Sequence, residues 1–266
     1  MTRELLYSLA ALAALVPAAL LGLRQRPARD ALFWAALGLA TAGAAAWCVV
    51  QTGSAWRTGL STTLWVTVTV SLALFGVIAA VSREAWRLAP LLVPYMLILA
   101  VFAAALRHGP QGGLAEDAPT VWVAVHIGVS VVTYGLVTVA AVAALAAFLQ
   151  ERALKAKRPT ALTRTLPSMA DCERLLVRLL ALGESVLAVG LASGMAVQYE
   201  ETGRLLTLDH KILLTGAAFV VIGALLGAHY VSGLRGRQAA RAVLLAYLLL
   251  TLGYPGVKFV TDVLLA

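Results

Sequence analysis

Residues 121–149 read VWVAVHIGVSVVTYGLVTVAAVAALAAFL, a run without a single lysine, arginine, aspartate or glutamate. An α-helix rises about 1.5 Å per residue, so roughly 20 apolar residues cross the hydrocarbon core of a bilayer. The run is longer than this. It predicts a transmembrane helix, and apolar blocks of similar length fill most of the chain on both sides of it.

The composition extends this prediction to the whole chain. Of the 266 residues 61% are hydrophobic and only 13% are charged, whereas a soluble domain carries about 25% charged residues. The mean hydropathy is +0.88. We therefore expect an all-α fold, a polytopic membrane helix bundle of about eight transmembrane helices. The other spans are expected at about residues 4–23, 31–50, 62–82, 87–106, 174–198, 209–232 and 242–264.

The polar segments are too short for a large water-soluble domain, since the longest covers roughly residues 150–171. We expect a single membrane domain over residues 1–266, with four N-terminal helices in 1–106 and four C-terminal helices in 121–266. The first block is expected to be a membrane span rather than a cleaved signal peptide, because its strong positive cluster follows the apolar run instead of preceding it.

Basic residues are divided unequally between the two sets of loops, fifteen against six. Because cytoplasmic loops carry the excess of lysine and arginine, both termini are expected outside. The net charge of +8 is thus a topology signal, and nucleic acid is not an expected partner. The inner set is Arg24, Arg26, Arg29, Arg83, Arg87, Arg152, Lys155, Lys157, Arg158, Arg164, Arg174, Arg178, Arg235, Arg237 and Arg241, and the outer set is Arg3, Arg57, Arg107, Arg204, Lys211 and Lys258.

A polar stripe interrupts the apolar run at residues 121–149. His126, Ser130, Thr133 and Tyr134 have the spacing of one helix face. Such a stripe inside a bilayer must face protein, water or a ligand. Glu184, about ten residues into the next predicted span, is a further ionisable residue within the membrane and therefore a candidate for function.

The four histidines sort by depth. His210 and His229 are nineteen residues apart on one predicted helix, or roughly 28 Å, so they cannot bind one small ligand together. His126 and His210 both fall in the outer leaflet on different helices and can converge, and His108 lies in the loop just outside. His229, near the inner end, has no second histidine at its level.

Two neutral imidazoles at one level suit haem iron. Zinc is a weaker interpretation, because no cysteine or carboxylate joins the histidines at ligand spacing. A single membrane histidine can also simply donate a hydrogen bond to a neighbouring helix.

Four stretches together carry a family resemblance: VHIGVSVVTY at 125–134, LPSMADCERL at 166–175, HYVSGLRGRQAA at 229–240 and TLGYPGVKFV at 251–260. In this order and spacing the chain resembles the cytochrome c assembly family (CcsA/CcmC-like), and within it the YpjD/HemX branch. The resemblance is strong over about 120–266, whereas the first four helices match only in hydropathy and order.

The resemblance implies a haem-handling protein of the bacterial inner (cytoplasmic) membrane, because better-studied members carry haem across the membrane and present it on the outer face. It implies that His126 is an outer axial ligand and that His229 lies where haem enters. Asp209 and Lys211 correspond to the family's W-D-P-K stretch, with His210 in place of proline. We therefore expect haem b as the cofactor, bound through His126 and His210. The expected partners are membrane lipid, haem and other cytochrome assembly proteins.

Residues 197–208 read VQYEETGRLLTL and lack the tryptophans that cradle haem in the family's handling enzymes. This keeps an alternative open, a non-haem accessory or regulatory protein in tetrapyrrole synthesis or metal-ion homeostasis that kept the fold. Its working surface would be the basic loop 152–164, for which anchoring to anionic lipid is the simpler interpretation. A transporter or channel has no support from paired broken helices. We expect no enzyme, because no nucleophile is paired with a base.

Overall fold

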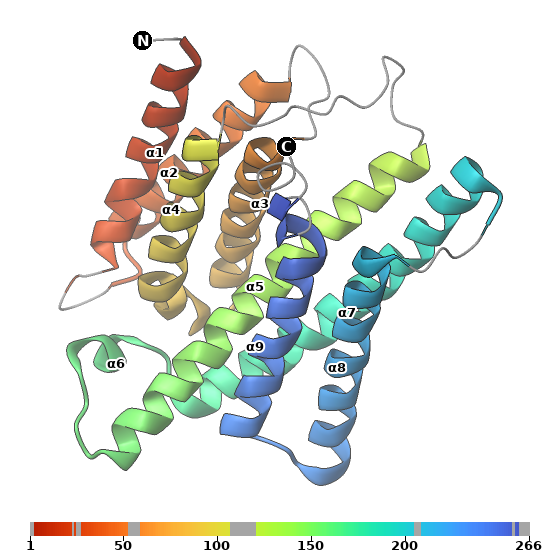
Figure 1. The fold of residues 1–266 in the computed structure, drawn as a ribbon. Helices are drawn as coiled ribbons and strands as arrows, with labels where there is room; N and C mark the ends of the chain where they lie inside the picture. The colour runs from red at the N-terminus through yellow and green to blue at the C-terminus, as the bar shows by residue number, and fades with distance from the viewer. Residues whose placement is uncertain are drawn as a thin grey trace.

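The computed structural model describes residues 3–22, 24, 28–52, 59–106, 121–204, 209–256 and 259–260, and in these ranges every regular element is a helix (Figure 1). The first half contains α1 (Arg3–Leu21), α2 (Ala31–Thr52), α3 (Leu60–Val81), the 3-10 turn η1 (Ala85–Leu88) and α4 (Ala89–Ala105). The second half contains α5 (Val121–Lys155), the short α6 (Ala161–Thr165), α7 (Met169–Thr202), α8 (His210–Ser232), α9 (Arg237–Thr251) and the π-helix η3 (Leu252–Gly256).

The protein is a polytopic membrane helix bundle, as predicted. Within the described ranges seven helices are long and apolar enough to cross a membrane, namely α1, α2, α3, α4 with η1, α5, α7 and α8. The eighth predicted span corresponds to α9, which has 15 residues and continues into the five-residue η3. α9 begins at Arg237, five residues before the predicted 242–264, and most of the chain after Gly256 lies outside the described residues.

The helices form two rings of four. In the first ring α1 packs against α2 and α4, and α3 packs against α2 and α4. In the second ring α5 packs against α7 and α9, and α8 packs against α7 and α9. The contact between α3 and α5 joins the rings, which lie side by side in Figure 1.

α5 is the central helix and α8 the peripheral one. In the most apolar 18-residue stretch of each helix, 83% of the α5 residues are buried, against 17% of the α8 residues. α5 packs most extensively against α7, because three glycines of α7 face it. A Cβ atom on Gly183, Gly190 or Gly194 would lie 3.3 Å or less from a side chain of α5. Small residues let two helix backbones approach closely within a membrane.

Two helices extend beyond the predicted spans at their polar ends. α5 continues to Lys155, where the Lys155 ammonium pairs with the Glu151 carboxylate one turn earlier. α7 begins at Met169 instead of 174, because the Ser168 hydroxyl accepts a hydrogen bond from the backbone N–H of Asp171 and caps the helix. At about 1.5 Å per residue both helices are roughly 50 Å long, which exceeds the roughly 30 Å of a hydrocarbon core.

α6 was not predicted and lies in the polar segment between α5 and α7. Thr160 and Thr163 cap each other reciprocally at its start. The Gln150 side-chain amide of α5 donates hydrogen bonds to the carbonyls of Thr163, at 2.8 Å, and Pro167, at 2.9 Å. This polar segment is therefore folded back on the end of α5.

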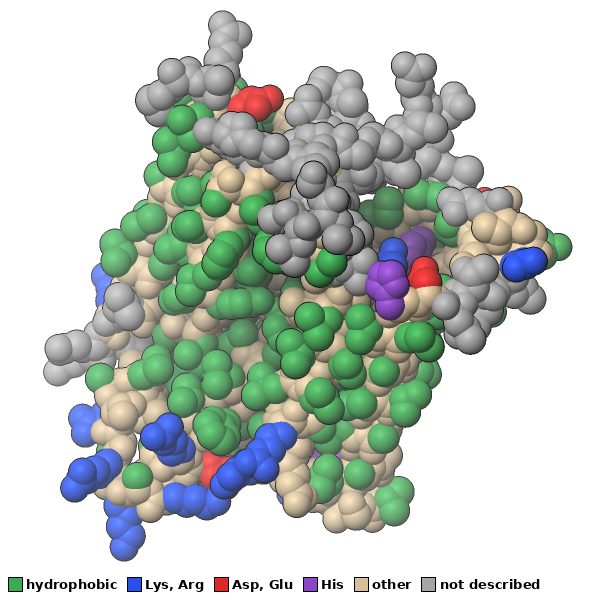
Figure 2. Space-filling model, in the orientation of Figure 1, with side chains coloured by type: hydrophobic (Ala, Val, Ile, Leu, Met, Phe, Trp, Pro, Cys, Tyr) green, Lys and Arg blue, Asp and Glu red, His purple; other side chains and the backbone are tan. Residues whose placement is uncertain are grey.

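The ends of the bundle differ in charge. Figure 2 shows most of the visible lysine and arginine side chains gathered at one end. The first residues of α1 and the last of α9 lie toward the opposite end (Figure 1). This arrangement agrees with the predicted orientation, in which the basic end faces inward and the chain begins and finishes outside.

Candidate functional site

His126 lies in the second turn of α5, and its half-buried ring is directed at α7. Its Nδ1 is 3.2 Å from the backbone oxygen of Gly190 and 3.2 Å from the hydroxyl oxygen of Ser193. A carbonyl oxygen can only accept, so Nδ1 carries the proton in this hydrogen bond. The neutral imidazole then keeps its lone pair on Nε2, which is the arrangement of most metal-ligating histidines.

The position of the His126 ring depends on Gly194. A Cβ atom there would lie 2.9 Å from Cε1 and 3.3 Å from Nδ1 of the ring. The segment from Gly190 to Gly194 of α7 therefore both anchors the ring through Gly190 and Ser193 and makes room for it. Ser193 is buried and also donates a hydrogen bond to Gly190.

The rest of the predicted stripe does not continue this site. The Thr133 hydroxyl bonds to the Val129 carbonyl of its own helix. The Tyr134 hydroxyl is 3.1 Å from the hydroxyls of Tyr247 and of Thr251 on α9. Tyr247 is also hydrogen-bonded to Tyr95 of α4. These hydroxyls form a polar cluster where α4, α5 and α9 meet, and thus tie the two rings together.

The N-terminus of α8 lies near His126. The Lys211 ammonium is close enough to act electrostatically on the His126 ring. His210, the first residue of α8, is exposed. Asp209 caps the helix by accepting a hydrogen bond from the backbone N–H of Ile212 at 2.8 Å. Figure 2 shows histidine beside basic and acidic side chains at this end.

His229 lies at the other end of α8. Its Nδ1 is 3.1 Å from the backbone oxygen of Leu234, and its ring contacts Tyr230 edge-on. The turn that follows needs glycine, because Gly233 and Gly236 have φ of 68° and 67°. The 229–240 motif thus forms a tight turn that also holds the His229 ring.

Glu184 lies in the contact between α7 and α8. A Cβ atom on Gly223 would be 3.1 Å from Oε1 of Glu184, so the glycine makes room for the carboxyl group. In the described part of the chain, Oε2 is buried without a hydrogen-bond partner. Glu184 is separated from the His126 site, because the His126 ring packs against Gly194, ten residues further along α7.

His108, the remaining candidate, lies outside the described residues. Among the residues that the structure describes, no three histidine, cysteine, aspartate or glutamate side chains form a group that could hold a metal ion. Haem iron needs only one or two protein ligands, because the porphyrin supplies the others.

Sequence reasoning missed the partners of the candidate residues. Nothing in the pattern of α7 marks Gly190 and Ser193 as the acceptors for His126, and Ser193-Gly194 is indistinguishable from an ordinary small-residue contact. Tyr95 and Tyr247 are isolated aromatics in apolar blocks. Only their hydrogen bonds, between Tyr95 and Tyr247 and between Tyr247 and Tyr134, show that they belong to one cluster.

Comparison with known proteins agrees with this architecture. The pattern of the family described as cytochrome C assembly protein matches residues 58–265. The chain belongs to the cytochrome c assembly protein family. The match begins before α3, so this family member shares with its relatives two helices that the motif resemblance covered only by hydropathy and order.

Two relatives illustrate the range of the family. A protein of Azospirillum brasilense, described as a 28.8 kDa protein in the nifR3-like 5' region, is 55% identical over 270 aligned positions covering all of both chains. The inner membrane protein YpjD of Escherichia coli (strain K12) is 27% identical over 187 residues, 70% of this chain and 69% of that protein.

Proposed function

We propose that this family member is a haem-handling protein of the bacterial inner membrane that binds haem b near the outer face, with His126 and His210 as axial ligands of the iron. One observation carries the proposal. The hydrogen bond from Nδ1 of His126 to the Gly190 carbonyl leaves Nε2 as the nitrogen available to a metal.

The surroundings of His126 fit an anionic porphyrin. The ring sits in the second turn of α5, and His210 is an exposed residue in the first turn of α8. The positive end of the α8 dipole and the Lys211 ammonium both lie in the first turn of α8. Haem propionates are carboxylates, so this positive potential favours their binding. Bound haem would supply a redox-active iron, which His126 and His210 would hold and orient.

His229 has a separate role in the proposal. Its Nδ1 is also anchored to a backbone carbonyl, that of Leu234, so Nε2 is again the available nitrogen. Because it lies at the inner end of α8, it cannot share an iron with His126. We assign it to a second haem-contacting position near the inner face, so that the protein handles haem at two levels.

The decisive experiment is absorption spectroscopy of purified protein titrated with haem. The wild type is expected to give a saturable Soret band and a low-spin spectrum in the reduced state. Either His126→Ala or His210→Ala is expected to convert it to a five-coordinate high-spin spectrum, and added imidazole is expected to restore six-coordination. Gly128→Ala is the matched control, because Gly128 lies two residues from His126 on α5 and a Cβ atom there meets nothing within 4 Å, and it should leave this spectrum unchanged.

A wild-type protein without a Soret band after haem loading would refute haem binding. A band that persists unchanged in His126→Ala and His210→Ala would refute the assigned ligands while leaving haem binding in place.

The second candidate is a non-haem accessory or regulatory protein, favoured by the absence of tryptophan from 197–208. Its working surface would be the exposed basic side chains around α6, which are Arg152, Lys155, Lys157, Arg158 and Arg164. Reversing these charges should then abolish capture of a protein partner from membranes. Unchanged capture would refute this version. Neither candidate requires catalysis by the chain.

A further inference from the structure

A pocket opens between α1, α2 and α4 at the basic end of the bundle, far along the chain from His126. Its inner space has a volume of about 30 Å³, which is room for roughly two water molecules or a few methylene groups. α1 and α4 meet tightly just beside the pocket, where Gly22 has no side chain. A Cβ atom on Gly22 would lie 3.0 Å from Cα of Pro90.

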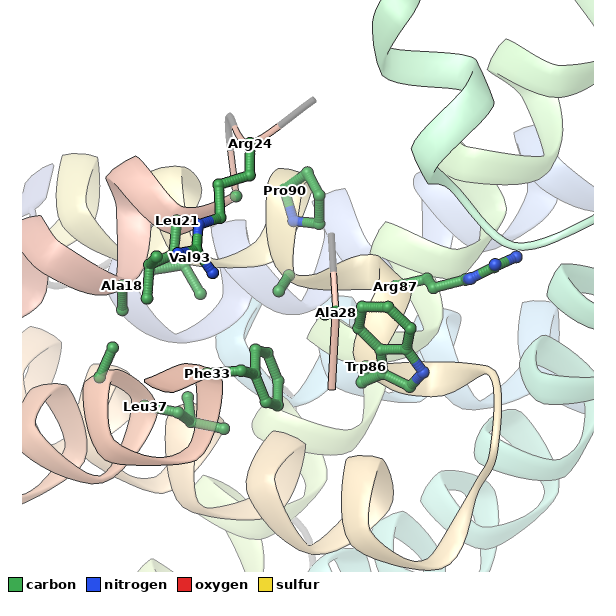
Figure 3. A pocket seen from close by; sticks show the side chains of 13 residues that line it. Ala18, Leu21, Arg24, Ala28, Phe33, Leu37, Trp86, Arg87, Pro90 and Val93 are labelled. Atoms are coloured by element: carbon green, nitrogen blue, oxygen red, sulfur yellow. The ribbon is translucent and has the colours of Figure 1, made fainter. Parts of the chain in front are cut away.

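The walls of the pocket are apolar. Ala18 of α1, Ala36 and Leu37 of α2, and Val93 of α4 are buried and line it, and the rings of Phe33 and Trp86 complete the lining (Figure 3). The Phe33 and Trp86 rings contact each other edge-on, with centroids 6.0 Å apart. The pocket can therefore accept a few methylene groups of an alkyl chain without burying a polar group.

The mouth of the pocket carries positive charge. Figure 3 shows the Arg24 side chain reaching toward Leu21 and Val93, while the Arg87 side chain extends away from Phe33. Arg24 contacts the Asp30 carboxylate at 3.4 Å through Nη1. A guanidinium has five N–H donors, so this one contact leaves capacity for a phosphate.

The side chains near the mouth of the pocket are of the kind found at the membrane interface, which favours a lipid headgroup as the ligand. Arginines stack on tryptophans there, with the Arg29 guanidinium 5.3 Å from the Trp34 ring centre and that of Arg87 5.7 Å from the Trp86 ring centre. Aromatic and basic side chains of this kind mark the membrane interface. Basic pockets between helices on the cytoplasmic side suit anionic headgroups.

We propose that this pocket binds one anionic phospholipid of the inner leaflet, with its phosphate on Arg24 and the upper part of one acyl chain among Ala18, Ala36 and Val93. The lipid ties the end of α1 to the start of α4. The site is independent of the proposed axial ligands His126 and His210, which lie at the other end of the bundle.

Native mass spectrometry of the full-length protein in mild detergent tests the site. Phosphatidylglycerol is compared with phosphatidylcholine of the same acyl chains, and one equivalent of phosphatidylglycerol is expected to bind about tenfold more tightly. Arg24→Ala should weaken phosphatidylglycerol binding about fivefold to tenfold. Arg152→Ala is the matched control, because Arg152 is an exposed arginine of the same face outside the pocket, and it should change binding less than about twofold.

Ala36→Leu fills the pocket while keeping every charge, and it should also lose the bound lipid. If the ligand were a soluble phosphate compound without an acyl chain, Ala36→Leu would bind it as tightly as wild type does. That result would overturn the assignment to a lipid. Equal losses in Arg24→Ala and Arg152→Ala, or equal binding of the two lipids, would overturn the site.

A thermal melt provides a second measurement. A ligand that binds only the folded state raises the melting temperature. Phosphatidylglycerol should therefore raise the melting temperature of wild type and Arg152→Ala, but not that of Arg24→Ala or Ala36→Leu. A rise of the same size in all four proteins would refute the proposal.

Discussion

Replacing Gly194 with alanine would place a methyl carbon 2.9 Å from Cε1 of His126, whereas ordinary contacts begin near 3.4 Å. The ring therefore has to move away from α7 by about half an ångström. Its two hydrogen bonds, from Nδ1 to Gly190 and Ser193, are already 3.2 Å long. At about 3.7 Å neither contact remains a hydrogen bond.

The variant is expected to lose the hydrogen bonds that orient the His126 ring, while the proposed metal-binding nitrogen itself is retained. Such mutations typically weaken metal affinity about 10-fold to 100-fold, and a lost hydrogen bond costs about 1 kcal/mol in stability. We expect Gly194→Ala to raise the dissociation constant for haem by about tenfold or more, without removing the ligand itself.

Gly128→Ala is the matched control. Gly128 lies two residues from His126 on α5, and a Cβ atom there meets nothing within 4 Å. The assay is a haem titration of wild type, Gly194→Ala, Gly128→Ala and His126→Ala, followed by the Soret absorbance. If Gly194→Ala binds haem within about twofold of wild type while His126→Ala does not, anchoring by α7 is unnecessary. If Gly194→Ala and Gly128→Ala weaken haem binding equally, the effect is not specific to the His126 ring.

Three other changes test the fold. Tyr247→Phe removes the hydroxyl shared between α4, α5 and α9 and should destabilise the protein by about 1 kcal/mol in detergent unfolding; an unchanged midpoint would contradict the cluster. Gly233→Ala, at φ 68°, should cost about 1–2 kcal/mol, whereas Gly216→Ala, with open space around it, should be neutral or stabilising; equal effects would exclude the backbone explanation. Gln150→Ala should release the α6 segment and speed tryptic cleavage after Lys157, and unchanged proteolysis would show that the amide does not hold it.

The sequence by itself determined the class of fold and the approximate spans, and it predicted their orientation. Helix length, hydropathy and the position of arginines are local properties, so the window at 121–149 and the basic loops could be interpreted without knowing any contact. The same locality placed His126 and His210 toward one end and His229 toward the other. It could not predict α6, because that helix depends on the Gln150 amide reaching across the segment.

Only the tertiary structure decided which helices meet. The pairing of α5 with α7 depends on glycines that lie more than 40 positions from the residues they contact, as between Gly194 and His126. The Tyr95–Tyr134–Tyr247 cluster and the Arg24 pocket likewise join segments far apart in the chain. In a bilayer, an apolar helix face can be covered by lipid as well as by protein, so an apolar pattern does not specify a partner helix. Close packing of small residues does, and it exists only once the helices are assembled.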